Sequence, residues 1–424
     1  MAVARRRHLL LRSPTVRDRE PEAPPPPARS AAAEIFLWSR AAIWAAAVFA
    51  FLVFEPNRHP RAARWDDPSL TRDLGYVTDV WARWDSVWFL RIAEHGYGAA
   101  AGAASAFYPL YPLTLAGLGR CLGGHYVLSG LLVSLAACLV SFVLLSRLAE
   151  RRLGADGARR AVLYLAVFPM SLFLQAVYSE SLYLALALGA FVLAERGRFA
   201  WAGAVTGLAV LTRIAGVALI PALAVIAWRS GNRRRALAEL AVAPVIFLAY
   251  PLFLWADRGD PWAFARAQGF WNRHLSPAGP FGGLWDGLRA GWAGIEQLVS
   301  GSHTHRYWTP ISLEDSDPMR VAALNLETLL FLFVFIWLAV LAWRRFGAPY
   351  GLFAVVSLAI PLSVPSDRWP LLSIPRFGLV LFPLFLALAS VGGRSPRTHT
   401  AILVVSSVML GVAVAQFALW QWTA

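Results

Sequence analysis

The sequence predicts an all-α, polytopic membrane protein, and two observations lead to this prediction. Of the 424 residues, 58% are apolar and 15% are charged, whereas a soluble domain has about 45–50% apolar and about 25% charged residues. The apolar residues also fall into blocks that lack the period-two alternation of barrel strands. Each block is long enough to cross about 30 Å of hydrocarbon as a helix. The clearest blocks are 126–148, 236–255, 321–343 and 400–420.

Arginine clusters between these blocks predict which side of the membrane each connection occupies. Every basic residue is arginine, and the clusters follow the positive-inside pattern. The net charge of +14 therefore reflects topology, and we expect no nucleic-acid partner. The clusters assigned to the cytoplasm are 147–160, 229–235, 344–345 and 394–397.

We predict about eleven spans, with the N-terminus in the cytoplasm. Residues 1–33, rich in arginine and proline, are expected to form a disordered cytoplasmic tail, and residues 34–424 a single transmembrane domain. Two long segments, about 55–105 and 256–320, then fall on the outer face and are expected to contain short interfacial helices. Each has seven acidic residues against six arginines, and long translocated segments are largely exempt from the charge rule. Residues 107–119 fit a re-entrant or interfacial helix better than a full span.

The segment 80–97 is the most informative part of the first outer segment. Five of its residues recur at spacings of 3, 4, 3 and 4, which predicts one face of a helix that ends at Gly96. They are Trp81, Trp84, Trp88, Arg91 and His95. Such a helix suits the membrane interface, where we expect Trp84, Trp88 and Arg91 to contact the substrate.

Asp85 lies beside this face, at the depth where a lipid phosphate and a sugar would lie. In a partly desolvated site its carboxylate can accept a proton from a hydroxyl group. The alternative is that the helix is an interfacial anchor and that Asp85 is only solvated or caps the helix.

Four polar residues fall at the outer ends of predicted spans, namely Tyr178, Glu180, Arg213 and Arg376. Ionisable groups at membrane depth are costly, so each is a hypothesis for function. Arg213 and Arg376 can bind a donor phosphate through bidentate hydrogen bonds. The alternative is that they snorkel to the interface or pair with Glu180. Glu180 would then either orient the acceptor or neutralise Arg213.

Five short motifs occur in order along the chain. They are R-W-D-S-V-W-F-L-R-I-A at 83–93 with Gly96-Tyr97, F-Y-P-L-Y-P at 107–112, Y-S-E-S-L at 178–182, L-T-R at 211–213 with Gly216, and P-R-F at 375–377. In this order they resemble the motifs of the PIG-V-type mannosyltransferases, which belong to the GT-C class of membrane glycosyltransferases. The stretch W-N-R-H at 271–274 resembles a further family element, and we expect Trp271 to contact the sugar. The resemblance runs from about residue 36 to the C-terminus.

This resemblance implies a GT-C-like fold and an inverting transfer of a sugar, usually mannose, from a polyprenyl-phosphate donor to an acceptor hydroxyl. It maps the acidic residue of the family's first outer loop onto Asp85 as general base, and it places the segment 256–320 over the acceptor. The active site would lie on the outer face of the plasma membrane, in contact with membrane lipid.

The chain has no lysine and much alanine, which indicates a GC-rich and hence bacterial genome. We therefore expect a glycolipid or an envelope glycan as the acceptor, rather than a GPI precursor. Motifs typical of metal sites, such as C-x-x-C or H-E-x-x-H, do not occur. The sequence thus predicts no metal site and no required cofactor, although a divalent metal remains compatible with the chemistry.

Two other functions are compatible with a polytopic chain. A transporter or flippase for lipid-linked sugars predicts polar residues at mid-membrane on several spans, and duplicated halves. A non-catalytic membrane subunit of a glycosylation complex predicts that Asp85 can be replaced freely. The polar residues of this chain lie mainly at the outer ends of spans, which favours the enzyme.

Overall fold

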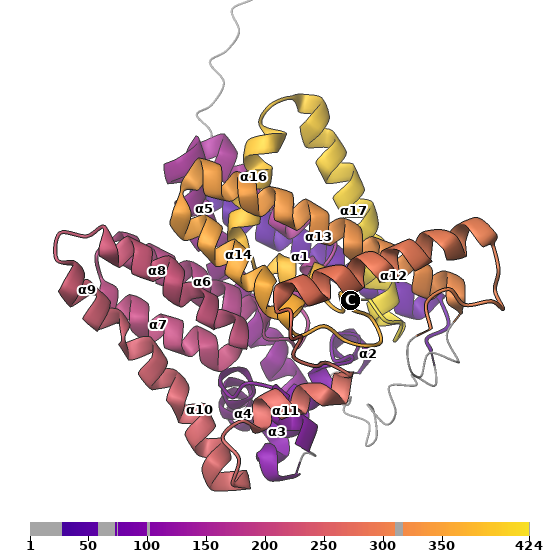
Figure 1. The fold of residues 1–424 in the computed structure, drawn as a ribbon, viewed down its shortest axis with the longest axis horizontal. Helices are drawn as coiled ribbons and strands as arrows, with labels where there is room; N and C mark the ends of the chain where they lie inside the picture. The colour runs from indigo at the N-terminus through magenta and orange to yellow at the C-terminus, as the bar shows by residue number, and fades with distance from the viewer. Residues whose placement is uncertain (1–27, 58–72, 74, 100–101, 310–316, 424) are drawn as a thin grey trace, which may run out of the picture.

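A computed structural model describes residues 28–57, 73, 75–99, 102–309 and 317–423. Figure 1 draws the remaining residues as a thin grey trace. Within the described ranges every regular element is a helix, and the one extended pairing is an isolated bridge between Arg273 and Ser366. The predicted all-α class is therefore confirmed.

Among the described residues, five helices are long and apolar enough to cross a membrane. They are α1 (Ala28–Val53), α5 (Tyr126–Ala166), α9 (Arg233–Leu240) continued by α10 (Val242–Arg258), α13 (Pro318–Phe346) and α17 (Pro396–Ala418). The chain is thus a multi-pass membrane protein. Of the predicted tail, residues 1–27 lie outside the described ranges, and α1 begins at Ala28, before the boundary predicted at residue 34.

Shorter helices fill the space between the long ones. They are α6 (Glu180–Glu195), α7 (Phe199–Thr212), η3 (Ile214–Ala218), α8 (Leu219–Trp228), α14 (Ala348–Ser363), α15 (Ile374–Leu379) and α16 (Phe382–Gly392). A perpendicular span needs about 20 residues, and α6 has 16 residues and α7 has 14. The predicted count of eleven spans is therefore not confirmed.

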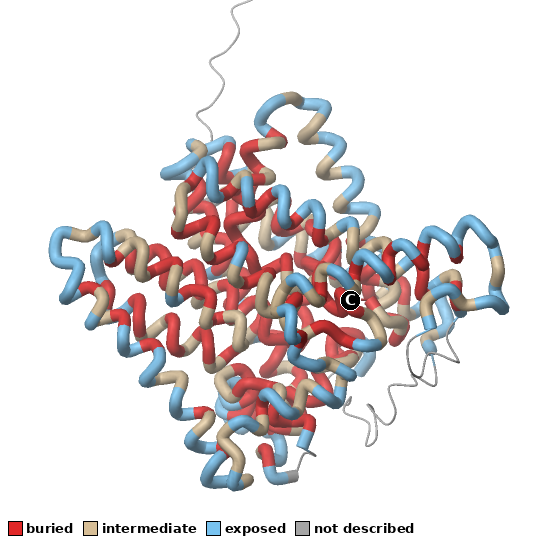
Figure 2. Tube along the Cα trace, in the orientation of Figure 1, coloured by how far each residue is buried: buried red, intermediate tan, exposed pale blue. Residues whose placement is uncertain are grey.

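The centre of the molecule is built around α5. This helix packs against α1, α4 (Leu110–Cys121), α6 and α16, and Figure 2 shows that the buried residues gather in this middle region. A glycine allows one close approach, because a Cβ on Gly130 would lie 2.5 Å from Val177. The segment 167–179, which includes η2 (Ser171–Leu174), is consequently held in the core.

The arginine cluster at 147–160 lies on α5 itself. The helix runs to Ala166 but breaks at Gly154, whose φ of 71° suits glycine. The predicted loop is thus a sharp corner between two helical segments.

The prediction of a helix over 80–97 is wrong for residues 80–85. The short helix α2 (Tyr76–Asp79) ends before it, and α3 (Ser86–Ala99) begins only at Ser86. Residues 80–85 form turns, because their backbone groups bind elsewhere. The Val177 N–H donates to the Trp81 carbonyl at 3.1 Å, and the Tyr178 hydroxyl donates to the Arg83 carbonyl at 3.1 Å.

The tryptophans of this segment therefore do not share one helical face. Trp81 precedes the helix and is fully buried, and Trp88 on α3 is 7% exposed. Both lie in the core and not at a lipid interface. The helix breaks at its predicted end, since Gly96 leaves the helical conformation with a φ of 75°, and a short helical turn then continues to Ala99.

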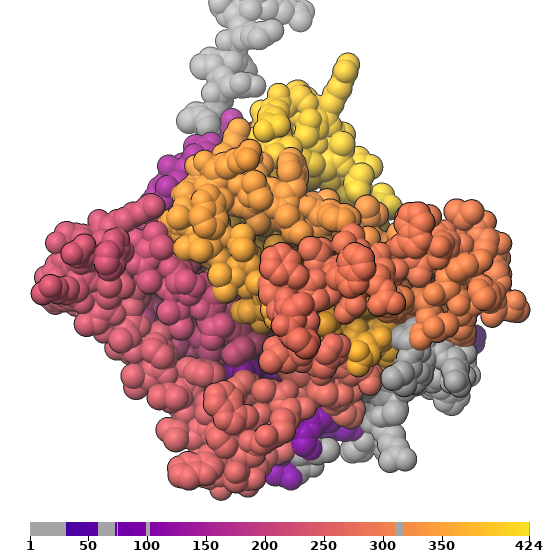
Figure 3. Space-filling model, viewed as in Figure 1, coloured from indigo at the N-terminus to yellow at the C-terminus, as the bar shows by residue number. Residues whose placement is uncertain are grey.

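The two segments that we predicted on the outer face, here still called the outer segments, contain the remaining helices. The first has α2, α3 and η1 (Gly102–Ala106), and the second has α11 (Ala263–Arg266), η4 (Ala267–Trp271) and α12 (Pro280–Ser300). Helix α12 lies on the surface in Figure 3, with its glycines against α13 and α14. At 21 residues it is longer than the short interfacial helices that we predicted. Helix α4 has 12 residues and is too short to span, as predicted for 107–119.

Candidate active site

A cavity of about 420 Å³ lies where the two outer segments meet the ends of the core helices. Most of its lining is apolar or aromatic, and a few ionisable groups converge on it from six separate parts of the chain. They are Asp85, Tyr108, Tyr178, Arg213, Arg273 and Arg376. A mostly apolar cavity with a few convergent polar groups is typical of a ligand site.

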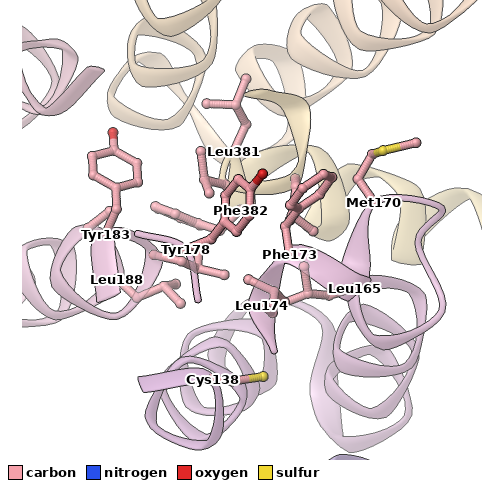
Figure 4. Close-up of a cluster of buried hydrophobic side chains, with 14 of the residues drawn as sticks. Cys138, Leu165, Met170, Phe173, Leu174, Tyr178, Tyr183, Leu188, Leu381 and Phe382 are labelled. Carbon is pink, nitrogen blue, oxygen red and sulfur yellow. The ribbon is translucent and has the colours of Figure 1, made fainter. Parts of the chain in front are cut away.

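Asp85 is held at the cavity by Tyr178. The Tyr178 hydroxyl accepts a hydrogen bond from the Asp85 backbone N–H at 3.1 Å and donates one to the Arg83 carbonyl at 3.1 Å. The Tyr178 ring is buried in the apolar cluster of Figure 4 and packs on Phe173 with ring centroids 4.8 Å apart. A ring locked by packing thus positions the turn that presents the Asp85 carboxylate.

Two carboxylates and two guanidinium groups form a continuous series of ion pairs beside the cavity. Arg376 Nη1 lies 2.7 Å from Asp85 Oδ2, and Arg376 Nε lies 3.2 Å from Glu180 Oε1. Arg213 Nη1 donates to the same Glu180 oxygen at 2.6 Å and to the Ser179 hydroxyl at 3.1 Å. Glu180 is fully buried, whereas Asp85 is 15% exposed and lines the cavity. Of the two carboxylates, Asp85 is therefore the one that a substrate can reach.

The ring of Phe377 lies close to three arginines of the cavity. The guanidinium carbons of Arg213, Arg273 and Arg376 lie 5.7, 5.7 and 5.8 Å from its centroid. Each distance is within the range of a cation–π interaction. Phe377 thus lies close to all three positive groups of the cavity.

Most of the predicted site residues meet at this cavity. Asp85, Tyr178, Arg213, Trp271 and Arg376 line it, and Glu180 lies behind it in contact with both arginines. The pairing of Arg213 and Arg376 with Glu180 is one of the two alternatives that the sequence left open. Phosphate binding by these arginines stays a prediction.

Three predicted contacts lie elsewhere. Trp84 packs against Trp422 with ring centroids 5.3 Å apart, and Trp88 packs between Phe107 and Trp271. Neither these two nor Arg91 lines the cavity. Their direct contact with substrate was expected from a continuous helix over 80–97, which does not form.

Several lining residues were missed, among them Arg273, Phe377 and Trp422. Arg273 lies in the W-N-R-H stretch and Phe377 in the P-R-F motif. The family resemblance therefore marked both motifs, but it did not identify these two residues as part of the site. Trp422 follows the last helix, and no pattern in the sequence marks it.

No three His, Cys, Asp or Glu side chains gather into a possible metal site within the described ranges. The histidine pair 303 and 305 does not provide one either, since His303 is instead bonded to Asp317 at 3.1 Å. That the protein requires no metal stays a prediction of the sequence.

Comparison with known proteins agrees with the motifs. Residues 74–227 match the model of a family described as mannosyltransferase (PIG-V). This part of the chain matches the PIG-V mannosyltransferase family. The matched residues include Asp85, Tyr178, Glu180 and Arg213, whereas Trp271 and Arg376 lie beyond them. The resemblance predicted from the motifs is thus confirmed over this range.

A mouse protein, GPI alpha-1,6-mannosyltransferase 2 from Mus musculus, is 39% identical to the chain over 131 residues. That match covers 28% of this chain and 26% of the mouse protein, so the chain spans about a quarter of the relative's length.

Solved structures of two proteins are also similar. ArnT from Cupriavidus metallidurans, bound to undecaprenyl phosphate, is 17% identical with a TM-score of 0.44, over 88% of this chain and 63% of ArnT. The apo oligosaccharyltransferase of Archaeoglobus fulgidus is 14% identical with a TM-score of 0.41, over 91% of this chain and 56% of that protein.

Proposed function

We propose that this protein is a GT-C-like, inverting glycosyltransferase. It transfers a sugar, most simply mannose, from a polyprenyl-phosphate donor to a hydroxyl group of a glycolipid or an envelope glycan. The reaction takes place on the outer face of the membrane, in the cavity between the two outer segments.

One observation carries the proposal: the reachable Asp85 carboxylate lies in a cavity whose other ionisable lining groups include three arginines. A transferase of this class needs a base for the acceptor hydroxyl and cations for the departing phosphate. The match of residues 74–227 to a mannosyltransferase family supports the same assignment.

The cavity walls suit the two halves of such a donor. Aromatic rings, among them Phe107, Tyr108 and Trp271, line one side and offer flat surfaces for a sugar. Apolar residues of η3 and α14, among them Ile214 and Ile360, line another and suit an isoprenoid chain.

In the proposed reaction the acceptor hydroxyl donates its proton to Asp85 as its oxygen attacks the anomeric carbon. The bond from that carbon to the phosphate oxygen breaks, and the phosphate leaves with the electron pair. Attack occurs opposite the leaving group, so the configuration at the anomeric carbon inverts. Nearby guanidinium groups stabilise the negative charge that develops on the phosphate.

The donor class is the first point to test. Membranes with the overproduced protein are supplied with radiolabelled mannose either as polyprenyl-phosphate-mannose or as a nucleotide sugar, in the absence of enzymes that interconvert them. We expect label in glycolipid only from the polyprenyl-phosphate donor. Transfer from the nucleotide sugar alone would refute the proposed donor.

Tyr178 is expected to act as a positioning residue for Asp85. The variant Tyr178→Phe removes both hydrogen bonds that hold the Asp85 turn, so kcat should fall about tenfold, since each lost buried hydrogen bond costs about 1–3 kcal/mol. The KM for the donor should change little, because the cavity walls remain. The matched control is Tyr183→Phe, because the Tyr183 hydroxyl is buried without a hydrogen-bond partner among the described residues. Equal kcat values for the two variants would contradict the positioning role.

A further inference from the structure

The charges around the cavity do not balance. Arg376 and Arg213 are engaged with Asp85 and Glu180, at distances from 2.6 to 3.2 Å. Arg273 is the third guanidinium at the cavity, and no carboxylate of the described residues forms an ion pair with it. Among the described residues, three positive groups thus face two negative ones, which leaves one positive charge in excess.

Arg273 is bound by neutral groups. Its Nη1 donates to the Val364 carbonyl at 3.0 Å and its Nη2 to the Leu372 carbonyl at 2.8 Å. A guanidinium has five N–H donors, so three remain for a ligand. Burial and then the nearby Arg376 lower the pKa of Arg273 to about 10, against a smaller opposing effect of the Asp85 carboxylate. The group remains charged at neutral pH, and an anion beside it would relieve the cost of this burial.

The backbone fixes where this guanidinium lies. The strand-like stretch 272–276 pairs with 363–367, which leads to α15 and Arg376. The His274 N–H donates to the Pro365 carbonyl at 3.1 Å, and the Asp367 N–H donates to the Asn272 carbonyl at 2.9 Å. A guanidinium with three donors that no described residue uses is therefore held at the cavity, where it does not have to reorganise on binding.

We propose that Arg273 is the residue that binds the phosphate of the lipid-linked donor, while Arg213 and Arg376 mainly hold Glu180 and Asp85 in place. The excess charge of the site matches the single negative charge of a phosphodiester between a polyprenol and a sugar. The inference rests on the proposed function, since it takes the donor to be a polyprenyl phosphate.

The test measures binding and does not depend on turnover. Purified full-length protein in nanodiscs is titrated with undecaprenyl phosphate, with undecaprenol and with inorganic phosphate. The variants are Arg273→Met, which removes the charge, and Arg273→Lys, which keeps it. The control is Arg289→Met, since Arg289 is exposed on α12 and does not line the cavity. Melting temperatures confirm that each variant is folded.

We expect Arg273→Met to weaken binding of undecaprenyl phosphate by about tenfold to a hundredfold, the effect of losing hydrogen bonds to a charged group. Arg273→Lys should recover most of the affinity, and Arg289→Met should bind as the wild type does. Binding of undecaprenol should be equal in all four proteins, which a merely structural role of Arg273 would not produce.

A folded Arg273→Met variant that binds undecaprenyl phosphate like the wild type would overturn this inference and leave the proposed function intact. A wild type that binds undecaprenyl phosphate no better than undecaprenol would refute both. Binding of inorganic phosphate that depends on Arg273, with none of the lipid, would refute the lipid donor.

Discussion

Replacing Asp85 with asparagine is expected to lower the rate of sugar transfer about a thousandfold, within the range of a lost general base. Asparagine keeps the size and shape of the side chain but cannot take the proton of the acceptor hydroxyl. The ion pair between Arg376 and Glu180 remains, so the variant should fold and bind donor. The measurement is the initial rate of label transfer into glycolipid at equal amounts of folded protein.

The matched control is Glu94→Gln. Glu94 lies on α3 in the same outer segment, is exposed and does not line the cavity, so its replacement should leave the rate unchanged. Full activity of Asp85→Asn would remove Asp85 from the mechanism and make Glu180 the next candidate.

Glu180→Gln is expected to destabilise the folded protein by about 3 kcal/mol. Glu180 is fully buried between Arg213 and Arg376. Breaking a buried ion pair from one side leaves an uncompensated charge, at a cost of about 3–5 kcal/mol. Glutamine keeps the volume of the glutamate side chain, which places the expected cost at the lower end of this range. The measurement is the free energy of unfolding in detergent, obtained from denaturant titration.

The double variant Glu180→Gln/Arg213→Gln tests whether an uncompensated buried charge causes this loss of stability. Removing both charges leaves Asp85 and Arg376 as a balanced pair, so the double variant should be more stable than Glu180→Gln alone. The surface pair Arg235–Glu239 has the same kind of contact at 2.7 Å but lies on the exposed face of α9. Glu239→Gln should therefore cost less than about 1 kcal/mol. Costs that simply add in the double variant would argue against a buried charge as the cause.

The fold class and several helices could be predicted because lipid imposes a strict rule on the sequence. A chain in hydrocarbon must satisfy its backbone hydrogen bonds internally. Apolar runs of sufficient length therefore predict helices. The apolar blocks 126–148 and 321–343, for example, lie within α5 and α13. The number of membrane spans cannot be predicted in the same way, because helices such as α6 are shorter than the length that a perpendicular span needs.

The helix over 80–97 shows where periodicity fails. The spacing of Trp81, Trp84 and Trp88 fits a helix, but the backbone before Ser86 binds Val177 and Tyr178 instead. These partners are about 90 residues away in the chain, and tertiary hydrogen bonds of this kind leave no periodic signal. The same interaction is what presents Asp85 at the cavity.

The sequence predicted the main ionisable residues of the candidate site but not the balance of their charges. Glu180, Arg213 and Arg376 stand out as ionisable residues at predicted span ends, and Asp85 stands out beside the tryptophans of the first outer segment. Which cation is left without a carboxylate depends on distances in space, and only the folded arrangement reveals that it is Arg273.

The central claim, transfer with inversion from a polyprenyl phosphate, is tested most directly with purified protein in proteoliposomes. A polyprenyl-phosphate-mannose of known anomeric configuration is supplied with a glycolipid acceptor, and the product is analysed by NMR. We predict a glycolipid product whose anomeric configuration is opposite to that of the donor. A product with retained configuration, or no product with any glycolipid acceptor, would contradict the claim.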